Sequence, residues 1–125
     1  MAPFNLDHIK LILAECREYE PSHHMGRPFM SAYQIAIELE HRFPRETQDL
    51  PVGGVGTGER SSLAQRLAGF LSSVIRDGAD QEIEGGFISH SHLAEMRFVG
   101  NSGADIHVST SAAAHSIFRL SGPRR

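Results

Sequence analysis

The sequence has few of the residues that would assign it to a specialised class. It contains one cysteine, Cys16, which excludes an internal disulfide and with it a disulfide-stapled secreted scaffold. Its longest aliphatic run, Leu11–Ala14, is four residues long, whereas a membrane span needs about twenty apolar residues and a signal peptide about seven. Asp7 also stands where a signal peptide carries positive charge. We therefore expect a soluble, cytoplasmic protein.

Lysine is almost absent as well. Lys10 is the single lysine among 12 basic residues, and 15 acidic residues give a net charge of −3. Guanidinium groups suit phosphate and carboxylate recognition, although the arginine codons of a GC-rich genome would produce the same bias. The net acidity argues against a strongly cationic nucleic-acid binder and leaves a local basic patch open.

The length and composition are those of one ordinary globular domain, residues 1–125. Apolar residues make up 40% of the chain and charged residues 22%, which argues against wholesale disorder. Within this domain we expect a loop containing glycine and proline over residues 44–60 and a loose tail over residues 121–125.

Three main helices are expected in the first two thirds of the chain. The first should run over Leu6–Tyr19 with Asn5 as its cap, because apolar residues recur there every three or four positions. Pro21 marks its end. The loop that follows should extend to Pro28.

The second and third helices carry clearer start and stop signals. Ser31 with Gln34 three residues later forms a capping box, and this helix must end before Pro44. Ser62 begins the third helix in the same way. Its exit is expected at Asp77–Gly78, because glycine tolerates the left-handed cap position.

After residue 80 the pattern changes. Gly85–Ile88 is expected to form a short strand or a tight bend, and Ser89–Phe98 a short helix. Gly100–Gly103 should be a turn. Asp105–Thr110 and Ser116–Leu120 alternate with period two, and we expect them to pair as antiparallel strands. The fold class is therefore α+β: three main helices, a short fourth and a small C-terminal antiparallel sheet.

A glycine-rich loop that leads into the third helix is a candidate anion site, because its amides and the helix N-terminus could cradle a phosphate or nucleotide. Its spacing approaches the phosphate loop, but Glu59 stands in place of the lysine. The alternative is that the glycines serve backbone shape. The candidate ligand residues are Gly54, Gly56, Gly58, Arg60, Ser61 and Ser62.

Histidines are numerous, yet they form no recognisable metal motif. A hairpin could bring together His90, His92, His107 and His115, but a His-x-His pair shares a face only on a strand, and a helix is expected there. There is also no Gly-x-Ser-x-Gly elbow. We therefore expect no metal, no cofactor and no catalytic residue.

The order of elements resembles that of a winged-helix DNA-binding domain. In that interpretation the short helix over 89–98 enters the major groove and the C-terminal hairpin contacts the backbone. The long connection between the second and third helices and the acidic net charge argue against it. The candidate residues are Ser89, His90, His92, Arg97, Arg119, Arg124 and Arg125.

A competing interpretation places a protein contact in the C-terminal half. Phe87, Ile88, Phe98 and Phe118 cluster there, and a small sheet can leave an apolar edge for another chain to complete. The alternative is that these residues fill the core. We predict a non-catalytic binding module whose partner is another protein or a second copy of itself, with DNA binding and anion binding as alternatives.

Overall fold

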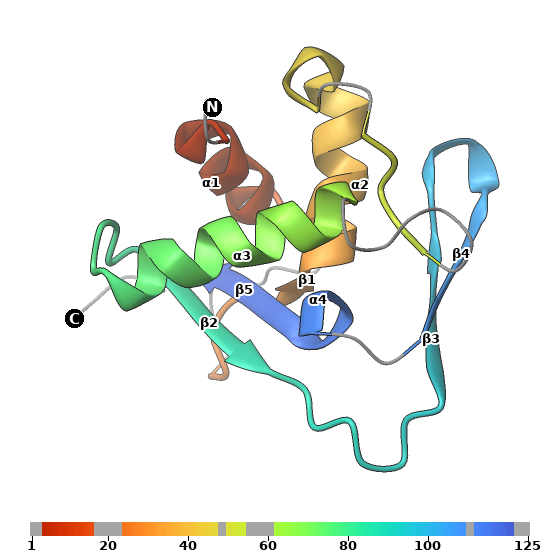
Figure 1. Cartoon of the computed structure of the whole chain (residues 1–125). Helices are drawn as coiled ribbons and strands as arrows, with labels where there is room; N and C mark the ends of the chain where they lie inside the picture. Colours follow the sequence, from red (N-terminus) through yellow and green to blue (C-terminus); the bar gives the residue numbers. More distant parts are fainter. Residues whose placement is uncertain (1–3, 17–23, 48–49, 55–61, 110–111, 122–125) are drawn as a thin grey trace.

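A computed structural model describes residues 4–16, 24–47, 50–54, 62–109 and 112–121 of the chain (Figure 1). The α+β class is confirmed, with three main helices, one short helix and small antiparallel sheets. The elements in chain order are α1 (Leu6–Ala14), β1 (Met30–Ser31), α2 (Ala32–Arg42), the 3-10 turn η1 (Pro44–Glu46), α3 (Leu63–Arg76), β2 (Ile83–Phe87), β3 (Glu95–Val99), the 3-10 turn η3 (Asn101–Gly103), β4 (Asp105–Ser109), α4 (Ala112–His115) and β5 (Ser116–Leu120).

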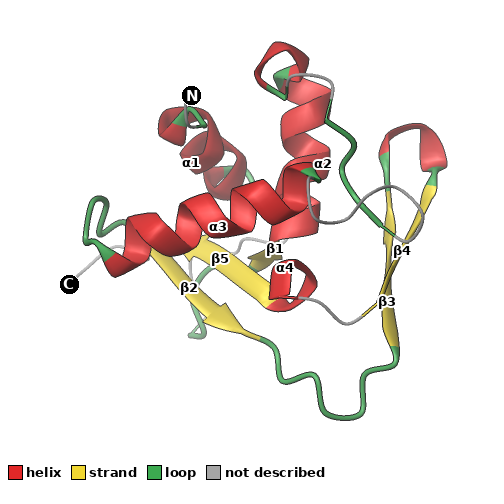
Figure 2. Cartoon of the chain, in the orientation of Figure 1, coloured by secondary structure: helices red, strands yellow, loops and turns green. Residues whose placement is uncertain are grey.

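The strands form two separate sheets (Figure 2). One has the order β1-β5-β2 and is covered by the helices, with α3 crossing over β2 and β5 (Figure 1). The other is the β3–β4 hairpin, which stands apart beside α2. Every helix in the described ranges is too short or too polar to cross a lipid bilayer.

The predicted caps are confirmed. Ser31 accepts from Tyr33 N–H while Gln34 accepts from Ser31 N–H at 2.8 Å, so the capping box of α2 is complete. α2 ends at Arg42, before Pro44. Ser62 likewise caps α3, whose exit passes through Gly78 at a φ of +67°.

The first helix is shorter than expected. α1 begins at Leu6 with Asn5 as its cap, as predicted, but it ends at Ala14 instead of Tyr19. The carbonyl of Ala14 accepts from Arg27 Nη1 at 3.4 Å, a tertiary contact that periodicity along the chain does not reveal. Residues 17–23, including Pro21, lie outside the described residues.

The helix predicted over Ser89–Phe98 is wrong. Residues 95–99 form β3, which pairs with β4 in the register Arg97↔His107. Along β3 the side chains of Met96 and Phe98 pack against the core while their neighbours face solvent, which is the period of a strand. The short fourth helix is α4 instead.

The expected pairing of residues 105–110 with 116–120 is also wrong. β4 pairs with β3, whereas β5 is the central strand of the other sheet. β5 lies antiparallel to β2 in the register Gly85↔Phe118 and to β1 in the register Met30↔Phe118.

The observed pairing also changes the order in which helices and strands follow one another in the first sheet. Two consecutive helices, α2 and α3, now precede β2, and β5 returns between β1 and β2.

One core joins the helices to the first sheet. All three main helices contribute buried apolar side chains to this core, which also contains Phe118 of β5. The buried residues are Ile9 and Leu13 of α1, Ile35 and Leu39 of α2, and Leu63, Leu67 and Leu71 of α3. The glycine- and proline-containing loop over 44–60 holds η1, while its residues 48–49 and 55–60 lie outside the described residues.

Candidate functional site

The outer edge of β2 is the most distinctive surface of the first sheet. β2 is the last strand in the order β1-β5-β2, so one of its two edges has no neighbouring strand among the described residues. Its residues Glu84, Gly85, Gly86 and Phe87 are exposed. Edge strands of this kind are templates for pairing with another chain.

Two hydrogen bonds show which backbone groups face outward. Ser121 N–H donates to Glu82 O at 2.7 Å, and Ile88 N–H donates to His115 O at 2.9 Å. Because bonding alternates along an antiparallel pair, the even-numbered residues of β2 bond to β5. The N–H and C=O groups of Ile83, Gly85 and Phe87 therefore point away from the sheet, and they have no partner in the described part of the chain.

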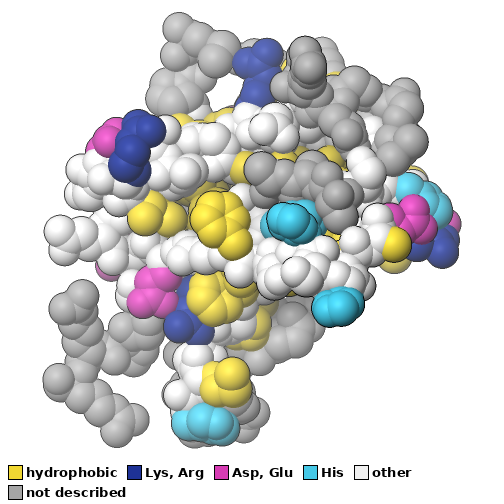
Figure 3. Space-filling model, turned by 60° about the horizontal axis from the view of Figure 1, so that its bottom comes forward, with side chains coloured by type: hydrophobic (Ala, Val, Ile, Leu, Met, Phe, Trp, Pro, Cys, Tyr) yellow, Lys and Arg dark blue, Asp and Glu magenta, His cyan; other side chains and the backbone are white. Residues whose placement is uncertain are grey.

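Apolar side chains accompany this edge. Phe87 is 78% exposed, and Ile88 beside it and Ile75 on α3 are also exposed. Figure 3 shows the face that comes forward when the bottom of Figure 1 is turned toward the viewer. Hydrophobic side chains gather on this face between an acidic and a basic group on one side and histidines on the other. An exposed apolar cluster on a free edge is typical of an association surface.

The two faces of β2 differ in chemistry. A Cβ on Gly85 would meet Ile75 Cδ1, so the odd-numbered residues face α3. The even-numbered face carries an ion pair between Glu84 and Arg119, with Nε to Oε1 at 2.8 Å. By this alternation Phe87 lies on the same side of the edge as Ile75 of α3.

The four predicted interface residues do not form one patch. Phe87 and Ile88 are exposed at the end of β2, whereas Phe118 is 3% exposed and belongs to the core. Phe98 is half-buried and stacks on Tyr33 with a centroid separation of 5.2 Å. Two of the four thus remain on the surface and two contribute to packing.

The two described arginines of the predicted nucleic-acid set lie on different sheets. Arg97 on β3 binds Asp105 at 2.8 Å. Arg119 on β5 binds Glu84, donates to Met25 O and Arg27 O, and lies over the Phe29 ring. Arg124 and Arg125 lie outside the described residues.

The histidine-containing segment is a loop. Ser89, His90 and His92 are exposed between β2 and β3, and His92 has a φ of +66°. His90 stacks on the buried ring of His115, with centroids 5.4 Å apart, whereas His107 faces Glu95 on the hairpin. Among the described residues no group of three or more potential ligands could hold a metal ion.

The start of the glycine-rich loop is engaged inside the fold. Gly54 is buried against the backbone of His107, and Ser62 is fully buried as the cap of α3. The first amides of α3 are also occupied, because Leu63 N–H and Ala64 N–H donate to Pro51 O and Val52 O. The other predicted anion ligands, Gly56, Gly58, Arg60 and Ser61, lie outside the described residues.

Sequence reasoning identified Phe87 but missed its setting. The sequence does not place Ile75 over Gly85, and the free edge depends on the pairing of β2 with a strand more than thirty residues away. The pair Gly85-Gly86 was the available signal, since glycine within a strand often marks a close approach of another element.

Comparison with protein-family models, with curated proteins and with solved structures finds no match for this chain.

Proposed function

We propose that this chain is a non-catalytic binding module that associates with a second copy of itself through the outer edge of β2. The observation that carries this proposal is the row of outward backbone groups on Ile83, Gly85 and Phe87, next to a phenylalanine that is 78% exposed. Pairing with a second strand would satisfy these groups and remove the ring from water.

The sequence of β2 supports a two-fold pairing centred on Gly85. In an antiparallel pair with this centre, Ile83 of one copy faces Phe87 of the other, and Gly85 faces Gly85. All three outward residues of each strand then form hydrogen-bonded pairs. The two sheets would join into one continuous sheet with a closed two-fold symmetry, so that no free β2 edge remains to recruit further copies.

Side-chain chemistry favours this register over its neighbour. With the centre at Gly85, Glu84 faces the side-chain-free Gly86. A centre at Glu84 would place two carboxylates directly opposite each other, which is destabilising. In the same register, the Phe87 ring of one copy would lie beside Ile83 of the other. This is the face of the sheet that carries the exposed Ile75, so the contact would bury apolar surface.

The opposite edge of the same sheet does not offer this surface. β1 consists of Met30 and Ser31 alone, and Ser31 already serves as the cap of α2. A strand of two residues that turns directly into a helix gives an incoming chain little to pair with.

The test is sedimentation equilibrium of the full chain over a range of concentrations. Phe87→Lys places a charge on the edge and removes the ring, and it should shift the protein to the monomer. Val99→Lys is the matched control, because Val99 is 70% exposed on the β3–β4 hairpin and undergoes a similar change of chemistry. This control should associate as the wild type does.

Two results would contradict the proposal. A wild-type chain that stays monomeric at every concentration has no self-association to explain. A dimer that both lysine variants leave equally intact would use another surface. Circular dichroism of both variants establishes that each is folded before the association is compared.

Nucleic-acid binding through α3 is the second candidate. It is supported by the position of α3 after α2 and before β2 and by the absence of acidic residues from α3. Arg66→Glu should abolish a fluorescence shift with duplex DNA that weakens steeply as salt rises. Arg97→Glu on the hairpin is the control and should leave this shift unchanged, and a wild-type titration without any shift would remove the candidate.

A further inference from the structure

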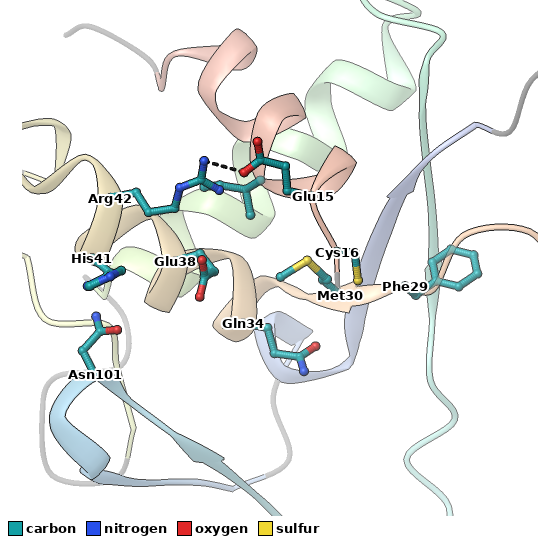
Figure 4. Close-up of a pocket in the computed structure, with 10 residues that line it drawn as sticks. Glu15, Cys16, Phe29, Met30, Gln34, Glu38, His41, Arg42 and Asn101 are labelled. Atoms are coloured by element: carbon teal, nitrogen blue, oxygen red, sulfur yellow. Dashed lines mark ion pairs between the residues drawn. The ribbon is translucent and has the colours of Figure 1, made fainter. Parts of the chain in front are cut away.

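A second surface is independent of the β2 edge. A pocket of about 670 Å³ lies over the outward side of α2, bounded by the end of α1, by the Phe29–Met30 segment and by η3 (Figure 4). Its volume falls within the range of about 300–1,000 Å³ that is usual for sites of small ligands. The side chains that line it come from four parts of the chain.

One of the two carboxylates in this pocket is already neutralised. Arg42 Nη2 lies 2.7 Å from Glu15 Oε1, at the rim nearest α1 (Figure 4). Glu38, one turn before Arg42 on α2, makes no hydrogen bond or ion pair within the described ranges, and it is partly buried. A half-buried carboxylate without a cation is electrostatically incomplete, because burial weakens its hydration without supplying a partner.

A second acceptor lies on the same side of the pocket. Asn101 Nδ2 donates to Ile37 O at 3.1 Å and to Glu40 Oε1 at 3.4 Å. These bonds occupy the amide nitrogen of Asn101 and leave its carbonyl oxygen as an acceptor. Asn101 lies next to His41 in the pocket lining that also includes Glu38 (Figure 4). A carboxylate and a fixed amide oxygen together suit a group that has several N–H donors.

Apolar side chains line one end of the pocket, while Gln34 and His41 add polar groups elsewhere in its lining. Met30 and Phe29 line the end of the pocket opposite Asn101, and the buried Ile12 contributes from α1 (Figure 4). An aliphatic stem can pack along such a wall while a charged head reaches the carboxylate. A carboxylate that has no cation among the described residues, close to apolar side chains, favours an organic cation as the ligand.

We infer that this pocket binds a guanidinium or ammonium group carried on an aliphatic stem. The cation pairs with Glu38 and donates to Asn101 Oδ1, and the stem lies against Met30. A basic side chain of a partner polypeptide and a free organic amine share this chemistry, and the experiment separates the two sources.

The experiment records amide chemical shifts of the full-length protein during titration with three probes. The first is agmatine, a free molecule with a guanidinium at one end of an aliphatic stem and an ammonium at the other. The second is a capped Gly-Arg-Gly peptide, and the third is the same peptide with citrulline, which keeps the shape of arginine and lacks its charge. Agmatine or the arginine peptide should shift the amides of α2 around Glu38, and the citrulline peptide should not.

Two variants with opposite expected effects sharpen the test. Glu38→Gln keeps the size of the side chain and removes its charge, so affinity should fall about tenfold. Arg42→Gln removes the cation that occupies Glu15, so affinity should rise by about threefold. Glu95→Gln on the distant hairpin is the charge-matched control and should change nothing.

The outcomes show whether the bound cation is a side chain of a partner polypeptide or a free amine, and whether the inference itself is wrong. Tighter binding of the arginine peptide than of agmatine indicates a partner side chain, and the reverse indicates a free amine. The inference is wrong if neither probe binds, if citrulline binds equally well, or if Glu38→Gln leaves the affinity unchanged. None of these results depends on whether the chain associates through β2.

Discussion

Ile75 of α3 lies over Gly85 of β2 so closely that a Cβ built on Gly85 would come within 2.7 Å of Ile75 Cδ1. This contact holds the last turns of α3 against the sheet, next to the edge that we propose for self-association. Gly85 therefore serves two purposes, because it admits the helix on one face and would lie at the two-fold centre of the pairing.

Gly85→Ala should destabilise the protein by about 1 kcal/mol, because Ile75 must shift to make room. Gly86→Ala is the matched control on the same strand. Its Cβ would lie 3.9 Å from Ile117 Cγ1, an ordinary contact, so the loss of unfolded-state entropy should stabilise by about 0.4–1 kcal/mol. Urea unfolding at a concentration that keeps the chain monomeric measures both.

The cause is tested by a double-mutant cycle with Ile75→Ala. If the cost of Gly85→Ala comes from this contact, it should shrink when the isoleucine is truncated. Equal destabilisation by Gly85→Ala in both backgrounds would show that the contact is not its origin.

A second glycine should be far less tolerant. Gly53 has a φ of +131°, and its Cβ would lie 2.9 Å from Ser62 Oγ and 3.0 Å from the Tyr33 hydroxyl. Gly53→Ala therefore combines backbone strain with displacement of the α3 cap, and a loss of about 2–3 kcal/mol is expected. Gly103 has a φ of +81° with open space around it. Gly103→Ala therefore introduces backbone strain without a steric clash and should lower stability by about 1 kcal/mol. Thermal unfolding in which the two variants lose equal stability would contradict the steric argument.

The helix boundaries were predictable because their signals are local. Ser31 with Gln34, and Ser62 with Gly78, act through hydrogen bonds and backbone preferences that span a few residues, and the structure places them as expected. At the early end of α1, the Ala14 carbonyl accepts instead from Arg27, thirteen residues further along the chain. No pattern within the helix encodes that contact.

The sheet partners were not predictable for a related reason. Period-two alternation identifies a strand without naming its neighbour, and β5 pairs with Met30 and Gly85, which are distant in sequence. In the segment before residue 100, Leu93 and Met96 lie three apart, which is a helical spacing. The alternation of Met96 and Phe98 with the charged Glu95 and Arg97 is the stronger signal, and it indicates a strand.

The candidate site was predictable in part. Phe87 follows from its position in a glycine-rich segment, but the pocket over α2 brings Glu38 together with Asn101, which lies more than sixty residues later. A single carboxylate on the polar face of a helix is otherwise a solvated charge. Its significance depends on which other segments enclose it.

The ion pairs of Lys10 give a prediction about pH. Lys10 of α1 contacts Glu82 and lies 3.0 Å from Asp80 Oδ2. The hydrogen bond from Lys10, together with that from Glu82 N–H, lowers the pKa of Asp80, and the hydrogen bonds to Glu82 and Asp80 raise the pKa of Lys10. The stabilisation is therefore lost as pH falls through the lowered pKa of Asp80 and as pH rises through the raised pKa of Lys10.

Lys10→Met should accordingly lower stability by about 0.5–1 kcal/mol between these limits and make little difference beyond them. Urea unfolding of the wild type and the variant across the pH range measures the difference in their free energies of unfolding. Arg76→Met removes the exposed pair with Asp77 and should have the smaller effect. If this difference in stability stays constant into strong acid, Lys10 acts through the packing of its alkyl chain and not through its charge.

The register of the proposed β2 pairing can be tested by cysteine cross-linking in a Cys16→Ser background. With the centre at Gly85, residue 84 of one copy faces residue 86 of the other as a non-hydrogen-bonded pair, whose Cα atoms lie about 4.5 Å apart. This separation is within the range that a disulfide spans. Gly86 has room for a side chain, since its Cβ would lie 3.9 Å from Ile117 Cγ1.

The double variant Glu84→Cys, Gly86→Cys should therefore oxidise to a covalent dimer, whereas Glu84→Cys alone should not. Two cysteines two residues apart on one strand project in parallel and cannot close on each other, so the bond must join two copies. Non-reducing electrophoresis after mild oxidation gives the result. Efficient cross-linking of the single variant would place the centre at residue 84, and failure of both variants in a chain that sediments as a dimer would assign the association to a surface other than β2.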